Sequence, residues 1–154
     1  MQKLDLASIA VRTGSGYPAP FDRPVVRRER RRLGDAGGLT QFGVNLLRLG
    51  PGVWSSQRHW HSAEDEFVYV LSGEVTLVTD DGEETLRAGD CVAFPKGRAN
   101  GHHLVNRGRE DATCLEVGSR VATDRTTYPD IDLVFDPAVD AYTHRDGRPY
   151  PGRD

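Results

Sequence analysis

Gly52-Val-Trp-Ser-Ser-Gln-Arg-His-Trp-His-Ser-Ala-Glu-Asp-Glu-Phe-Val-Tyr-Val-Leu-Ser-Gly73 is the stretch of sequence that decides the fold. His59 and His61 are two residues apart, so on an extended strand both imidazoles leave the same face. Glu66 opens the apolar run that follows and can point back toward them. Two imidazoles and one carboxylate on adjacent strands are donors that transition metals accept. The stretch therefore predicts a metal site held by β-strands.

A fourth ligand has to come from elsewhere, and His102-His103 is the other histidine cluster. Three imidazoles and one carboxylate suit Zn, Mn, Fe, Ni or Cu and are too soft for a dedicated Mg or Ca site. We expect one divalent transition metal ion, with Zn, Mn, Fe or Ni as the leading candidates. Such a shell leaves one or two positions for water or a small-molecule substrate.

Short apolar runs separated by turn residues dominate the rest of the chain. Runs at 42–49, 75–79 and 112–117 are bounded by Gly, Pro, Asp or Asn, and Asp80-Asp-Gly-Glu83 has the composition of a hairpin loop. Short strands at near-regular spacing predict an all-β sandwich or barrel of antiparallel strands. No stretch has a convincing 3.6-residue apolar period, so we expect little helix.

The length of 154 residues favours a single domain. Residues 1–24 are interrupted by Pro and Gly, so we expect an extended N-terminal arm lying over the surface. Residues 25–154 are expected to form one β-barrel domain, with residues 52–106 as its motif core. The C-terminal tail is aromatic and rich in turn residues, and we expect it to pack back on the barrel.

Composition indicates a soluble globular protein that binds neither nucleic acid nor membrane. The formal net charge is -3, and the basic run at 25–32 is expected to be a solvated edge strand. No apolar run approaches the length of a membrane span. Cys91 and Cys114 lie in apolar runs, so we expect two buried thiols and a cytoplasmic location.

Both faces of the run that follows Glu66 are largely apolar. Val68 and Val70 share one face, whereas Phe67, Tyr69 and Leu71 share the other. We therefore expect the barrel interior to cover one face and either the N-terminal arm or a second subunit to cover the other. A homodimer is the state that we predict.

The spacing of these residues resembles that of the cupin superfamily, whose first motif runs glycine, His-x-His, four residues, glutamate, six residues, glycine. His59, His61, Glu66 and Gly73 fit that spacing, and Gly52 precedes His59 by one residue more than usual. The second motif runs glycine, five residues, Pro-x-Gly, then histidine, three residues, asparagine. The residues that match it are Gly89, Pro95, Gly97, His102 and Asn106, with a gap before the histidine that is two residues longer than usual.

The resemblance implies a jelly-roll barrel that holds one metal ion through His59, His61, Glu66 and His102. The His-x-x-x-Asn match favours His102, and the neighbouring His103 is the alternative. Some single-domain bacterial cupins of this kind are labelled sugar-phosphate isomerases.

Two functions follow from a metal site in such a barrel. The first is a metal-dependent enzyme, with Glu66 as a catalytic residue, acting on a small oxygenated substrate by isomerase, lyase or dioxygenase chemistry. The second is a non-catalytic barrel that binds or senses a small molecule or a metal.

Overall fold

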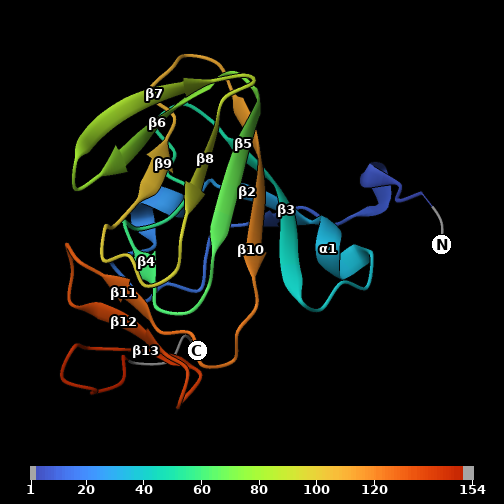
Figure 1. Ribbon diagram of the computed structural model, residues 1–154. Helices are drawn as coiled ribbons and strands as arrows, with labels where there is room; N and C mark the ends of the chain where they lie inside the picture. The colour runs from blue at the N-terminus through green and yellow to red at the C-terminus, as the bar shows by residue number, and fades with distance from the viewer. Residues whose placement is uncertain (1–2, 151–154) are drawn as a thin grey trace.

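The computed structural model describes residues 3–150, and nearly all of its regular structure is β (Figure 1). Six strands form the largest sheet, in the spatial order β1-β2-β3-β10-β5-β8. Their bounds are Arg12–Thr13 (β1), Glu29–Arg32 (β2), Phe42–Leu49 (β3), Ala112–Ser119 (β10), Glu66–Ser72 (β5) and Cys91–Phe94 (β8). All neighbours in this sheet run antiparallel, as the alternating apolar runs predict.

A second sheet of three strands faces the first. Its order is β7-β6-β9, with bounds Gly82–Arg87 (β7), Glu74–Thr79 (β6) and His103–Val105 (β9). The turn at Asp80-Asp81 connects β6 to β7, and Thr79 and Gly82 on either side of it are cross-strand partners. The predicted hairpin is thus confirmed. The main apolar core lies between the two sheets. Its buried residues are Leu47, Leu49, Val53, Val68, Val70, Val75, Leu77, Leu86, Leu104, Ala112 and Cys114.

The C-terminal segment adds a third sheet below the barrel, seen in orange and red in Figure 1. Its order is β13-β12-β11-β4, with bounds Ala141–Thr143 (β13), Leu133–Asp136 (β12), Thr126–Tyr128 (β11) and Trp60–His61 (β4). Because β4 belongs to the motif stretch, this sheet ties the C-terminal segment to the residues of the candidate site. The antiparallel jelly-roll barrel predicted from the sequence is thus confirmed.

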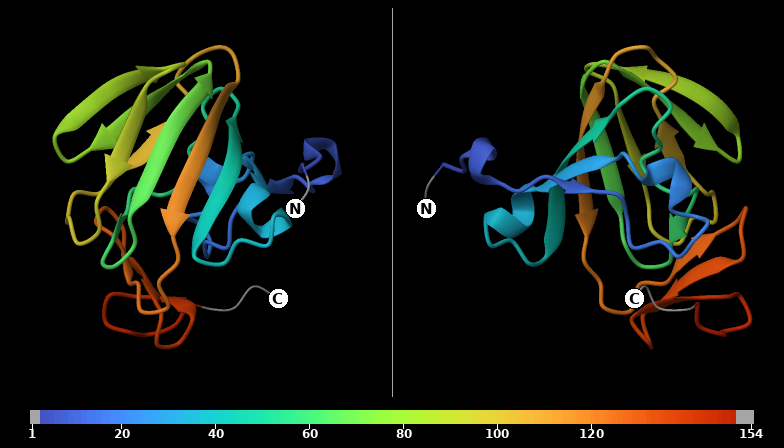
Figure 2. Two further views of the ribbon diagram at one scale, coloured as in Figure 1. Left: turned by 45° about the vertical axis from the view of Figure 1, so that its right-hand side comes forward. Right: turned by 180° about the vertical axis from the view of Figure 1, so that it is seen from behind.

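In the part of the chain that the structure describes, only three short helical segments interrupt the strands: η1 (Leu6–Ser8), η2 (Arg23–Val25) and α1 (Leu33–Ala36). Within residues 3–150, none of the helices has the length and apolar character needed to cross a bilayer. Seen from behind, the N-terminal segment runs along the barrel before the chain enters β3 (Figure 2). A second buried cluster forms where this segment meets the C-terminal sheet, and it contains Tyr17, Val25, Tyr128 and Leu133.

The basic run does not form the solvated edge strand that its composition predicts. Its strand, β2, lies inside the large sheet because β1 pairs with it on the outer side. Arg28 is only 7% exposed, since its guanidinium is bonded to the backbone of the N-terminal segment and of the loop before β4. Three arginines of this run line a cavity, as described below.

One expectation about burial is wrong, and one of two alternatives for β5 is removed. Cys91 is exposed and Cys114 is buried, because they stand on opposite faces of the large sheet. On β5, Val68 and Val70 face the core, whereas Tyr69 keeps 38% and Leu71 keeps 46% of its surface exposed. The N-terminal segment therefore does not cover the outer face of β5.

Candidate metal centre

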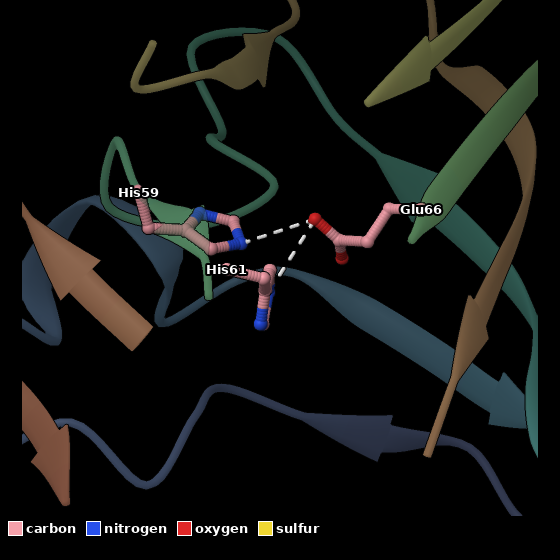
Figure 3. A group of neighbouring side chains, drawn as sticks. All are labelled: His59, His61 and Glu66. Carbon is pink, nitrogen blue, oxygen red and sulfur yellow. Dashed lines mark ion pairs between the residues drawn. The ribbon is translucent and has the colours of Figure 1, made fainter. Parts of the chain in front are cut away.

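The three ligand candidates of the motif stretch come together at one end of the barrel (Figure 3). His61 belongs to β4, His59 precedes it in an isolated bridge to His102, and Glu66 is the first residue of β5. One ligand atom each from His59, His61 and Glu66 lies within 4.8 Å of the others. The prediction that these residues lie together is met.

One oxygen of Glu66 is the point on which the imidazoles converge. Glu66 Oε2 lies 3.4 Å from His61 Nε2 and 3.5 Å from His59 Nε2. His102 joins the group through the same oxygen, because its Nε2 lies 2.9 Å from Glu66 Oε2. The ring of Phe94 stacks on His102 with ring centroids 3.6 Å apart, which fixes the orientation of that imidazole.

The neighbouring histidine has a different environment. His103 donates from Nδ1 to the carbonyl oxygen of Ser56 at 3.1 Å and packs edge-on against Trp54. Successive residues on a strand point to opposite sides, which separates the two rings. His102, and not His103, lies against Glu66.

Partners of the Nδ1 atoms determine the tautomers of His59 and His61. Nδ1 of His59 lies 2.9 Å from the carbonyl oxygen of Gln57, which can only accept, so this nitrogen carries a proton. Nδ1 of His61 donates in the same way to Asp124 Oδ2 at 2.6 Å. In the neutral imidazoles, both Nε2 atoms therefore present lone pairs toward Glu66.

Electrostatics at the centre favour an ionised carboxylate. Burial works to raise the pKa of Glu66, but the hydrogen bond from His102, together with the hydrogen bond and charge that His59 supplies and the charge that His61 supplies when these rings are protonated, outweighs it, so this pKa lies well below its usual value. Burial lowers the pKa of His59, yet Glu66 raises it more, so the net shift is upward.

Asp124 is a site residue that the sequence motifs do not identify. It lies in the loop between β10 and β11, is 6% exposed, and also accepts the backbone N–H of Ala63 at 2.7 Å. Burial acts to raise the pKa of Asp124, but its bonds to His61 and Ala63 lower it on balance. An aspartate 63 residues after its histidine carries no local sequence signal, so only the tertiary structure identifies it.

The centre lies between two hollows. A cavity of about 780 Å³ borders it on one side, and a smaller cavity of about 140 Å³ borders it on the other. Four residues line both cavities, namely Glu64, Glu66, Phe94 and His102. A small molecule in the larger cavity would contact the Glu66 carboxylate directly.

The donor set fits a transition metal ion. When the Nε2 atoms of His59 and His61 are unprotonated, they face the ionised Glu66 carboxylate, and all three groups can only accept a hydrogen bond. A proton or a cation must therefore lie between them. Nitrogen donors with one carboxylate oxygen match the preferences of Zn, Mn, Fe or Ni. The hydrogen bond from His61 to Asp124 is the outer contact that metal-binding histidines usually make.

Comparison with known proteins agrees with this fold. The cupin domain family model matches residues 45–118. A solved structure from Silicibacter pomeroyi DSS-3, called a sugar phosphate isomerase from a cupin superfamily, is 49% identical, covers 97% of each chain and superimposes with a TM-score of 0.91. A protein from Acidithiobacillus ferrooxidans, provisionally called a sugar phosphate isomerase, is 33% identical over 83% of this chain and 82% of its own, with a TM-score of 0.73.

Protein SchB of Streptomyces halstedii is 33% identical over 93 residues, which are 54% of this chain and 64% of SchB. The chain thus spans less than two thirds of that curated relative. The Silicibacter pomeroyi protein, in contrast, is matched over almost its whole length. This chain belongs to the cupin superfamily.

Proposed function

We propose that the protein is a metal-dependent enzyme that acts on a small oxygenated substrate. His59, His61, Glu66 and His102 are the proposed ligands of one divalent transition ion, and Glu66 is also the proposed catalytic residue. The observation that carries the proposal is the convergence of three imidazoles on Glu66 Oε2 beside a cavity large enough for a small metabolite.

A bound ion of this kind would act as a Lewis acid on a carbonyl or hydroxyl oxygen. The chain's own residues would orient the site and hold protons. Asp124 keeps the Nδ1 proton on His61, and Gln57 does the same for His59. The hydrogen bond between His102 and Glu66 holds one proton at 2.9 Å, next to the wall of the larger cavity.

Isomerisation of a sugar phosphate is the reaction to test first, because two structural relatives carry that name. Lyase and dioxygenase reactions use the same kind of donor set and remain part of the proposal. The alternative function is a non-catalytic barrel that binds or senses a ligand. The observation in its favour is that Glu66 Oε2 is already bonded to His102 Nε2 at 2.9 Å, which leaves that oxygen less free to accept a proton from a substrate.

Turnover separates the two functions. Purified full-length protein loaded with Mn, Fe or Zn is assayed with sugar phosphates, keto acids and catechols. Conversion that is lost in Glu66→Ala and kept in Glu84→Ala, an exposed carboxylate on β7, supports the enzyme. Thermal stabilisation by one of these compounds without conversion supports the binding protein.

Metal content tests the centre itself. We expect close to one divalent transition ion per chain by elemental analysis after metal reconstitution, and loss of that ion in the double variant His59→Ala with His61→Ala. His144→Ala is the matched control, because this histidine pairs with Asp132 in the C-terminal segment. A metal-free wild type under replete conditions contradicts the proposal.

We also propose a homodimer and a cytoplasmic location. The outer face of β5 exposes Phe67, Tyr69 and Leu71 side by side on one strand, which suits a second copy of the chain. Both cysteines are free, which suits a reducing compartment.

A further inference from the structure

The larger cavity is lined by two neighbouring arginines of the basic run, Arg28 and Arg30, and only Arg30 is paired with a carboxylate. Arg30 forms a two-point ion pair with Glu116, through Nε to Oε2 at 2.8 Å and through Nη2 to Oε1 at 2.9 Å. Arg28 lines the same cavity, and its guanidinium is bonded to the carbonyl oxygens of Gly14 and Ser55. Among residues 3–150, no carboxylate forms an ion pair with Arg28, so its charge has no direct counterion.

The donors of Arg30 are only partly used. Nη2 donates to Glu116 Oε1, and Nε lies 2.8 Å from Glu116 Oε2 without making a hydrogen bond, whereas Nη1 makes no hydrogen bond within the described part of the chain. The Arg30 side chain keeps 26% of its surface exposed and lines the cavity beside Glu66. A rigid guanidinium held by one carboxylate, with N–H groups left over, is arranged to bind an oxyanion.

The charge of Glu66, a residue of the candidate metal centre, also affects the pKa of Arg30. Burial lowers the pKa of Arg30, but the charge of Glu116 and, more weakly, that of Glu66 raise it on balance. Arg30 and Glu66 line the same cavity, so one small molecule could contact Arg30 with one end and the centre with the other.

A carboxylate shared by two arginines lies at the exposed rim of the cavity. Asp35 forms an ion pair with Arg120 and lies 3.6 Å from Nη1 of Arg32. The cavity is thus lined by four arginines and four carboxylates, the remaining two being Glu64 and Glu66. A divalent cation at the histidines would leave two positive charges, and a phosphate monoester carries about −2 at neutral pH.

We propose that Arg30 binds the phosphate group of a phosphorylated substrate, with Arg28 supplying a second positive charge nearby. The inference rests on the proposed function, since it places the reacting end of that substrate at Glu66. It goes further because it assigns a substrate-binding residue on β2, outside both histidine motifs. Two positive charges on one cavity wall, of which only Arg30 has a carboxylate partner, are costly to bury unless an anion joins them, which is the physical reason for the assignment.

Binding of inorganic phosphate to the full-length protein tests the assignment without any turnover. Isothermal titration is carried out on the metal-free and the Zn-loaded protein. Arg30→Lys keeps the charge next to Glu116 but lacks the planar fork, so we expect phosphate affinity to fall by about tenfold or more in both forms. Arg48→Lys is the matched control, because Arg48 forms exposed ion pairs with Glu29 and Asp111.

A double variant, Arg30→Gln with Glu116→Gln, keeps the test valid if Arg30→Lys does not fold, because it removes both charges of the pair together. Phosphate binding at wild-type strength in either folded variant overturns the inference, as does malonate binding more tightly than phosphate to the wild type. The experiment distinguishes failure of this inference from failure of the proposed function. If the wild type binds no metal but Arg30→Lys still lowers phosphate affinity, the proposed function fails and the Arg30 assignment stands. If the wild type binds metal normally and Arg30→Lys leaves phosphate affinity unchanged, only the Arg30 assignment fails.

Discussion

Asp124 Oδ2 accepts a hydrogen bond from His61 Nδ1 at 2.6 Å and thereby fixes which nitrogen of that imidazole faces Glu66. Asp124 is held in turn by the backbone N–H groups of Ala63 and Glu64 and by the hydroxyl of Thr126. The loop after β10 therefore positions a residue of β4. Removing the carboxylate tests whether this contact matters for the centre.

Asp124→Asn is expected to weaken Zn binding by about 10- to 100-fold, the usual effect of losing such an outer carboxylate. The amide cannot supply the negative charge, and its NH₂ group would compete for the position of the Nδ1 proton. Competition with a fluorescent chelator measures the affinity. Asp132→Asn is the control, because Asp132 accepts from His144 at 2.8 Å in a similar pair away from the centre. Equal losses in both variants would contradict the prediction.

The exposed apolar face of β5 predicts that two chains form a dimer. Sedimentation equilibrium of the wild type should give the mass of two chains. Tyr69→Lys should give one chain, because it puts a charge in the middle of the apolar face. Val139→Lys alters an exposed apolar residue in the C-terminal segment and should leave the dimer intact. A monomeric wild type would remove the dimer proposal.

The two cysteines should react at very different rates. Burial raises the pKa of the Cys114 thiol to about 12, so only about one molecule in ten thousand carries the thiolate at pH 8. Cys91 is exposed on the opposite face of the sheet. Titration with a thiol reagent at pH 8 should label one cysteine per native chain and both in denaturant. Loss of the fast reaction in Cys91→Ser identifies it, and two fast thiols in the native protein would count against the burial of Cys114.

Gly73 is expected to tolerate no side chain. Its φ is +72°, and a Cβ added there would lie 2.6 Å from the backbone oxygen of Asp111. Gly38 has nearly the same φ, +73°, but no atom within 4 Å of the added Cβ. Gly38→Ala should therefore cost only the left-handed backbone penalty, about 1–2 kcal/mol.

Gly73→Ala should lower the free energy of unfolding by a further ~1–3 kcal/mol, the typical effect of overpacking. Urea denaturation of the two variants measures the difference. Equal destabilisation would show that the turn between β5 and β6 can move away from Asp111.

The sequence by itself determined the fold class and the residues to examine. Alternation of apolar residues, turn glycines and the Asp80-Asp81 hairpin are local signals, and they predict antiparallel strands without reference to the rest of the chain. The two-residue spacing of His59 and His61 is equally local, because period 2 puts both side chains on one face. Their roles as metal ligands stay a prediction.

Tertiary structure alone decided what surrounds those histidines. The Asp124–His61 contact depends on β11 pairing with β4, and a pairing between distant strands leaves no periodic trace in either segment. Arg30 faces the cavity because the register pairs it with the buried Leu47, and paired residues share a face of the sheet. A shift of one residue would turn Arg30 outward, and a run of charged residues has no apolar pattern to specify that register.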